Sequence, residues 1–194
     1  MMRTPKILLF LFISCLCFGC QSSLRRESRI EKQDDVYVLS FANLSFSVSA
    51  GKGGRIVSFK CEDRELLTSD SVHSKYYGAT FWLSPQSEYW PQYQCVDELP
   101  YQAEIDKQIL RLVSPPDSIS GVSVTKEFSI SERDSSILIH YSVRNVSRQL
   151  KRLAPWDVTR VYGGLSFFPV GETDRMNKSD VTGGYEEIGR ASCR

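Results

Sequence analysis

The chain has 194 residues, of which 41% are hydrophobic, 11% aromatic and 24% charged, and its formal net charge at pH 7 is +1. This composition predicts one folded domain with appendages and excludes a chain that is disordered throughout. The first 19 residues hold Arg3 and Lys6 and no acid, so their removal changes the net charge from +1 to −1. The remainder lacks the basic excess typical of nucleic-acid-binding proteins, and we expect no nucleic-acid partner.

The N-terminal segment has the pattern of an export signal. Two basic residues precede an apolar run over residues 7–18, which is too short to span a bilayer. Gly19 and Cys20 follow, and polar residues come next. This order resembles the lipobox of bacterial lipoproteins, in which the cysteine becomes the lipid-bearing N-terminus. We therefore expect a signal peptide over residues 1–19 and lipidation of Cys20. The expected contact with the membrane is through this N-terminal lipid only, at the outer membrane or the periplasmic face of the bacterial cell envelope. Cys15 is a second choice for the lipid, and an ordinary cleaved signal with incidental cysteines is the alternative.

Residues 20–35 are mostly Ser, Arg, Glu and Asp, which predicts a flexible tether. From residue 36 apolar and polar residues alternate in short runs separated by turn residues, and no stretch has a helical period. This pattern predicts an all-β fold, an antiparallel β-sandwich, in which Lys126 interrupts one apolar face. We read the glycine-rich segment 50–54 as a hairpin turn rather than a phosphate cradle. The expected strands cover residues 36–39, 44–49, 55–60, 65–67, 103–105, 108–113, 121–130 and 137–145.

Two stretches, 76–91 and 154–169, combine aromatic rings with polar side chains. The prolines of the first stretch predict irregular structure. An aromatic ring can pack on the C–H face of a sugar while carboxylate and guanidinium groups bond its hydroxyls. We therefore expect a carbohydrate groove, and the alternative is that the rings fill the core and Asp157 pairs with Arg160 structurally. The expected binding residues are Trp156, Asp157, Thr159 and Arg160 on one wall, and Trp82, Gln86 and Trp90 on the other.

The order of several phrases resembles the galactose-mutarotase-like β-sandwich class, which includes the aldose 1-epimerases. The phrases are Gly53-Gly54-Arg55-Ile56-Val57-Ser58 with Glu65-Leu66-Leu67, Gly78 to Pro85, and the strand 137–145 that ends in Asn145. Phe-Trp-Leu-Ser-Pro-Gln and Ala-Pro-Trp-x-x-Thr-Arg resemble phrases of a group of secreted bacterial proteins. The resemblance implies a supersandwich that binds a sugar on a concave face.

Epimerases of this class use a histidine as acid and a glutamate late in the chain as base. The corresponding segment here, residues 154–157, has no histidine. Asp157 and His73 are the candidates for catalysis, and we expect Arg160 to lower the pKa of Asp157. His140 is interpreted as an exposed strand residue.

Residues 187–194 resemble the translation of a sequencing adapter, so we expect a fragment with a C-terminally truncated sandwich domain over residues 36–186. Cys61 and Cys95 remain in that domain, and the sequence leaves open whether they pair. With two histidines in the chain and no Cys-x-x-Cys pair in the sandwich domain, we expect no metal and no cofactor. Three functions stay open: a lipid-anchored protein that binds carbohydrate, an epimerase or other sugar-processing enzyme, and a structural envelope lipoprotein.

Overall fold

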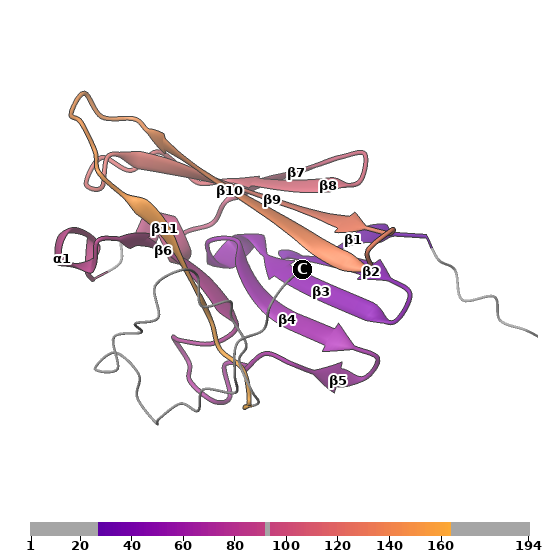
Figure 1. Ribbon diagram of the computed structural model, residues 1–194. Coiled ribbons are helices and arrows are strands. Elements are labelled where there is room, and N and C mark those ends of the chain that lie inside the picture. The colour runs from indigo at the N-terminus through magenta and orange to yellow at the C-terminus, as the bar shows by residue number, and fades with distance from the viewer. Residues whose placement is uncertain (1–26, 92–93, 164–194) are drawn as a thin grey trace, which may run out of the picture.

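The structure is an all-β sandwich, as the alternating sequence predicts. The computed structural model describes residues 27–91 and 94–163, in which two antiparallel sheets face each other (Figure 1). The expected signal peptide, Cys20, Gly164 and everything beyond it, including residues 187–194, lie outside the described residues. No helix in the described part of the chain is long and apolar enough to cross a membrane.

The larger sheet has seven strands among the described residues, in the order β1-β2-β3-β4-β6-β11, with the short β5 paired to β4. Consecutive strands up to β5 pair as hairpins, which follows from the short polar turns between them. Its strands are β1 (Arg29–Gln33), β2 (Val36–Phe41), β3 (Leu44–Ser49), β4 (Arg55–Cys61), β5 (Arg64–Glu65), β6 (Ala79–Ser84) and β11 (Ala154–Thr159).

The smaller sheet has four strands in the described residues, in the order β10-β9-β8-β7. They are β7 (Gln102–Asp106), β8 (Ile109–Val113), β9 (Val122–Ser131) and β10 (Ser136–Asn145). Within residues 27–91 and 94–163, three short helices lie in the connections: the 3-10 helix η1 (Ala50–Lys52), α1 (Gln86–Tyr89) and α2 (Gln94–Asp97). Each helix is about one turn long, too short to leave a period in the sequence.

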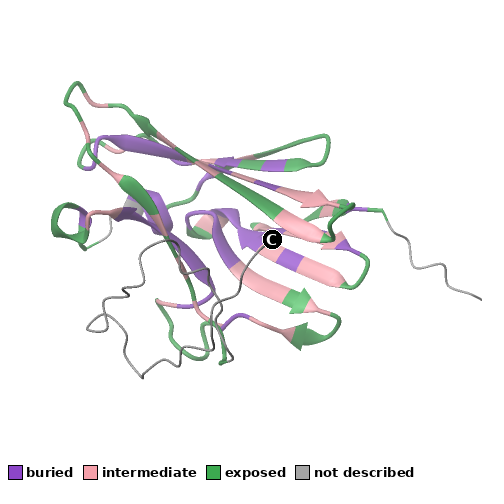
Figure 2. Ribbon diagram, viewed as in Figure 1, coloured by how far each residue is buried: buried purple, intermediate pink, exposed green. Residues whose placement is uncertain are grey.

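The core fills the space between the sheets, where Figure 2 shows most of the buried residues. Side chains alternate across each strand, so one apolar set from each sheet points inward. Complete burial of a Leu, Val or Phe side chain stabilises the fold by about 1.5–3 kcal/mol. Fully buried members include Leu39, Val48, Phe81 and Leu83 from the larger sheet and Leu110, Leu112, Val124 and Phe128 from the smaller one.

The expectation of irregular structure around residues 79–84 was wrong. β6 is a paired strand whose residues from Ala79 to Leu83 are all buried. The prolines allow this because Pro85 lies just after β6 ends, and Pro155 lies on β11, which has β6 on one side only. Both stretches singled out in the sequence therefore contribute a strand to the same sheet.

The N-terminal end also differs from expectation, because residues 29–33 of the expected tether form β1. Its backbone pairs with β2 along the whole strand, and Ile30 packs against the core. Ser28 adds an anchor, since its N–H and its hydroxyl donate to Glu132 Oε1 at 2.9 and 2.7 Å. Cys61 and Cys95 are both free thiols.

Candidate ligand-binding site

Pairing of β6 with β11 brings the two aromatic stretches together. Trp156 lies directly opposite Trp82 in the register, so both side chains project from the same face of the sheet. Their ring centroids are 5.4 Å apart, edge to face. Trp90, just after α1, is also 5.4 Å from Trp82, and Tyr76 is 6.0 Å from it. We call these four residues the aromatic cluster; Trp82 is its buried centre, whereas Trp90 is 46% exposed.

Arg160 closes one side of the aromatic cluster. Its guanidinium carbon lies 5.3 Å from the Trp82 ring centroid and 5.6 Å from that of Tyr76. Its Nη1 donates to the Thr80 hydroxyl at 3.1 Å, and desolvation lowers the pKa of Arg160. The guanidinium is thus held flat against aromatic faces, a geometry in which a cation is stabilised by the ring quadrupole.

Behind the rings lies a buried ion pair that the sequence reasoning missed. Arg55 Nη2 donates to Asp97 Oδ2 at 2.9 Å, and the Trp82 indole N–H donates to the same oxygen at 3.3 Å. The Arg55 and Asp97 side chains are only 5% and 6% exposed. Asp97 Oδ1 has no hydrogen-bond partner among the described residues. Desolvation raises the pKa of Asp97, against the opposing attraction of Arg55 and Lys126.

The glycine turn predicted as a hairpin is what seats Asp97. Gly53 has φ +64°, and a Cβ there would lie 2.3 Å from the carbonyl carbon of Asp97. The Gly53 N–H donates to the Leu99 carbonyl at 3.1 Å, so α2 and the residues after it pack directly on the turn. A side chain at position 53 would push Asp97 away from Arg55 and Trp82.

Lys126, which interrupts an apolar face in the sequence, is buried below this turn. Its Nζ donates to the Gly53 carbonyl at 2.6 Å and lies 5.2 Å from the ring centroids of Phe81 and Tyr101. Burial lowers the pKa of Lys126 to about 8. A lysine on an apolar strand face was thus a sequence signal for an unusual buried charge. Asp97, by contrast, lies in the one-turn helix α2, which is too short to leave a pattern in the sequence.

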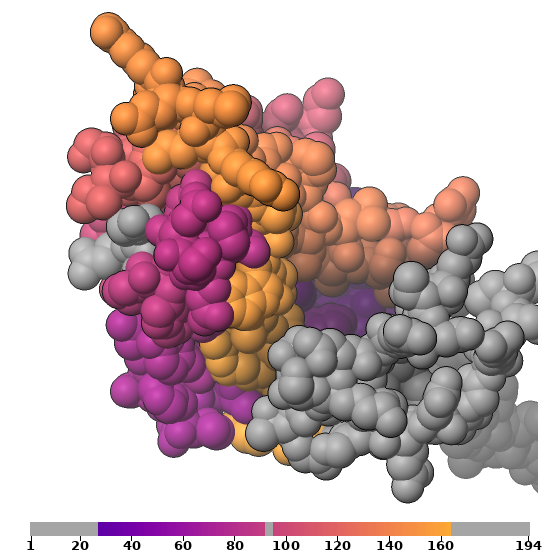
Figure 3. All heavy atoms as spheres, turned by 60° about the vertical axis from the view of Figure 1, so that its left-hand side comes forward, coloured from indigo at the N-terminus to yellow at the C-terminus, as the bar shows by residue number. Residues whose placement is uncertain are grey.

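A small hollow opens between the aromatic cluster and α2. Its volume is about 30 Å³, which suits one water molecule or one hydroxyl group. Figure 3 shows the segment around α1 and the strand β11 side by side on the surface of this part of the molecule. The lining residues are Lys75, Tyr76, Trp82, Trp90, Pro91, Asp97 and Glu98.

The structure divides the expected binding residues between two faces. Trp82, Trp90, Trp156 and Arg160 come together at the aromatic cluster. Asp157 lies opposite Phe81, a core residue, and so projects from the other face of β11 with Thr159. The reason is the period of two along a strand, which separates neighbours in sequence. Gln86 lies exposed at the start of α1.

On its own face, Asp157 accepts two hydrogen bonds. The Tyr141 hydroxyl of β10 donates to Oδ2 at 2.9 Å, and the Thr159 hydroxyl donates to Oδ1 at 3.0 Å. Desolvation and the Asp157 charge both raise the pKa of Tyr141. The structural ion pair considered for Asp157 and Arg160 is not among the ion pairs of the described residues.

The two histidines lie in different surroundings. His73 Nδ1 accepts from the backbone N–H groups of Lys75 and Tyr76 at 3.2 and 3.0 Å, and its ring is 5.0 Å from that of Tyr76. It therefore fixes the turn that presents Tyr76, at the edge of the aromatic cluster. His140 is exposed on β10, as expected, next to Ser142. Within the described residues no three His, Cys, Asp or Glu side chains are grouped as metal ligands.

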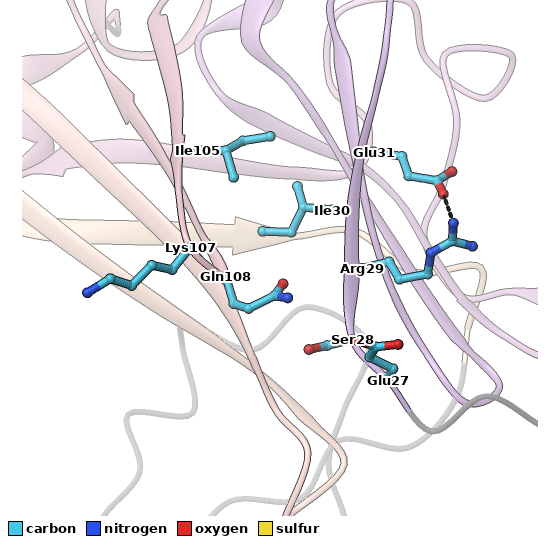
Figure 4. Close-up of a pocket in the computed structure, with 8 residues that line it drawn as sticks. All are labelled: Glu27, Ser28, Arg29, Ile30, Glu31, Ile105, Lys107 and Gln108. Carbon is cyan, nitrogen blue, oxygen red and sulfur yellow. Dashed lines mark ion pairs between the residues drawn. The ribbon is translucent and has the colours of Figure 1, made fainter.

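A second, wider hollow of about 390 Å³ lies between β1 and the turn from β7 to β8 (Figure 4). Two of its charged side chains are already paired, because Arg29 and Glu31 form an ion pair at 3.0 Å. It has no aromatic side chain and no buried unpartnered polar group among its lining residues.

No protein-family model matches the chain, and a search of curated proteins likewise found no match.

Proposed function

We propose that this protein binds a carbohydrate at the aromatic cluster. The observation that carries the proposal is the combination of two accessible tryptophans, Trp90 and Trp156, with a hollow that reaches a buried carboxylate. Aromatic rings offer a sugar an apolar surface, and a carboxylate offers its hydroxyls an acceptor. Asp97 Oδ1, which has no donor among the described residues, would be the acceptor for such a hydroxyl.

The dimensions favour surface stacking over deep burial of the sugar. A hollow of about 30 Å³ takes one hydroxyl, so the ring would lie outside, against Trp90 and Trp156. The hydroxyl that enters the hollow would approach Asp97, and Lys75 at the rim would supply a donor to a neighbouring sugar oxygen. Such a shallow site suits one residue of a longer glycan at least as well as a free monosaccharide.

The family and the cellular location that we propose rest on the sequence. We propose that the sandwich belongs to the galactose-mutarotase-like class, on the strength of the sequence phrases that lie on β4, β6 and β10. We also propose an exported lipoprotein anchored through Cys20. In that case Cys20→Ser releases the protein from cell membranes washed at high salt, which screens electrostatic contacts with lipid, and unchanged retention would contradict the anchor.

Glycan-array screening of the purified protein, followed by calorimetry with the best ligand, tests the binding proposal. We expect Trp90→Ala and Trp156→Ala each to weaken binding by roughly tenfold, the effect of losing one stacked ring at 0.5–1.5 kcal/mol plus its buried area. Asp157→Asn is the matched control, since it neighbours Trp156 in sequence but lies on the other face. Its affinity should equal that of the wild type.

The outcomes separate the three functions drawn from the sequence. Absence of binding to any glycan would overturn the proposal and favour a structural lipoprotein. Loss of binding in Asp157→Asn but not in Trp90→Ala would move the site to the opposite face. Anomer interconversion above the buffer rate, followed by NMR and lost in His73→Ala or Asp157→Asn, would make the protein an epimerase.

A further inference from the structure

The loop between β10 and β11 has an unusual charge. From residue 135 to residue 156 the sequence contains four basic residues and no acidic residue. All four lie at the end of β10 or in the loop, namely Arg144, Arg148, Lys151 and Arg152. Among them stands Leu150, whose side chain is 100% exposed. The loop projects from the molecule in Figure 3, where it forms the orange extension at the top.

Hydrogen bonds hold this loop in one conformation. Asn145 Nδ2 donates to the Gln149 carbonyl at 2.8 Å, and Asn145 Oδ1 accepts from the Ser147 N–H at 2.9 Å. The Ser147 hydroxyl accepts from the Gln149 N–H at 3.2 Å. The exposure of Leu150 is therefore a property of a structured loop, and its apolar surface gains nothing from water.

A neighbouring loop adds a second exposed apolar side chain at the same end of the sandwich. The backbone N–H groups of Val146 and Ser147 donate to the Gly121 carbonyl at 2.8 and 3.3 Å, which joins the loop to residues 114–121. Ile119 in that segment is 72% exposed. Asp117 is the acid of that segment, and its Oδ2 accepts the Ser120 N–H at 2.6 Å. These two segments together thus carry four basic residues and one acid.

We propose that this end of the sandwich docks on an anionic lipid bilayer. Basic side chains near such a surface each contribute about 1 kcal/mol, and an exposed leucine can bury its side chain at the boundary between headgroups and acyl chains. A soluble polyanion would engage the charges but leave Leu150 and Ile119 in water, which is why a membrane fits better. The loop lies at the end of β10 opposite to the end near β1, where the Ser28 hydroxyl donates to Glu132 (Figure 1).

Vesicle co-sedimentation of the full chain tests the proposal, with phosphatidylcholine vesicles compared with vesicles that also contain phosphatidylglycerol. Removal of the charges in Arg148→Gln/Lys151→Gln/Arg152→Gln should lower partition to the anionic vesicles by roughly a hundredfold, at about 1 kcal/mol per charge. Leu150→Ser should lower it by roughly tenfold. Any contribution of residues 1–26 is the same in every variant.

The control removes three exposed basic residues elsewhere, Lys60→Gln/Arg64→Gln/Lys107→Gln, and should bind the anionic vesicles like the wild type. Equal binding by the loop variant and this control would overturn the proposal. So would a loop variant that loses binding to a soluble anionic polysaccharide while its vesicle binding is unchanged. Circular dichroism of each variant establishes that the sandwich is intact.

Discussion

The charged groups on one face of the β6–β11 strand pair are buried, whereas the carboxylate on the other face is exposed. On the outer face, Asp97 and Arg55 pair behind Trp82 with about one-twentieth of each side chain exposed. On the inner face, Asp157 is exposed and is bonded to two hydroxyl groups. Desolvation makes a buried carboxylate depend on its partners, whereas water can replace the partners of an exposed one. The carboxylate on the outer face therefore depends more strongly on its hydrogen-bond and ion-pair partners than the one on the inner face does.

Truncation of Asp97 should have the largest effect on the free energy of unfolding. Asp97→Ala removes the carboxylate that accepts from Arg55 and the Trp82 N–H, and it leaves Lys126 with Asp157 as its remaining attracting carboxylate. We therefore expect a loss of about 3–5 kcal/mol in the free energy of unfolding. Asp97→Asn should cost less, because an amide oxygen still accepts from Arg55 and Trp82 and desolvation already disfavours the carboxylate. Urea denaturation measures both.

Asp157→Ala is the matched control for the inner face. Loss of its exposed hydrogen bonds should cost less than about 1 kcal/mol. A control as destabilised as Asp97→Ala would mean that the two faces do not differ in the way described.

A smaller effect, visible through pH, should come from Lys126. Its pKa is lowered to about 8 in the folded protein from an ordinary value of 10.5. Below pH 8 Lys126 is protonated in both the folded and the unfolded protein, so the free energy of unfolding is lowered by the full cost of burying its charge. Between pH 8 and 10.5 the unfolded chain binds more protons, so this group makes stability rise with pH by up to about 3 kcal/mol.

Lys126→Met should abolish that rise. The informative quantity is the stability of the wild type minus that of the variant at pH 7.5 and at pH 10, since tyrosine ionisation then affects both proteins. A difference that does not change with pH would show that Lys126 remains protonated in the fold throughout this range.

Much of the fold could be predicted because alternation is a local property. The runs that became β2, β3, β8, β9 and β10 were predicted to within a few residues. β6 and β11 were not, because their prolines and clustered rings obscure the alternation and because only pairing with each other and with β4 makes them strands. β1 has one apolar residue on its core face, too few to give a pattern.

The candidate site, too, could be predicted only in part from the sequence. Trp82, Trp90, Trp156 and Arg160 could be selected from the sequence, because rings and a guanidinium in quantity are unusual for a solvated segment. Their meeting depends on the register of Trp82 opposite Trp156. The same register places Asp157 on the other face of the sheet. This could not be inferred from its position next to Trp156 in the sequence.

The local sequence pattern was enough to predict the all-β class and most of the strands. It also singled out Lys126 and the residues from which an aromatic surface could be built. The tertiary structure decided which of them share a face, and it brought Asp97 to Arg55 and Trp82 from a segment without pattern. The physical reason is that alternation records whether a side chain points inward or outward. Which outward side chains become neighbours depends on strand pairing and on the close packing of α2 on Gly53, and both of these join residues far apart in the chain.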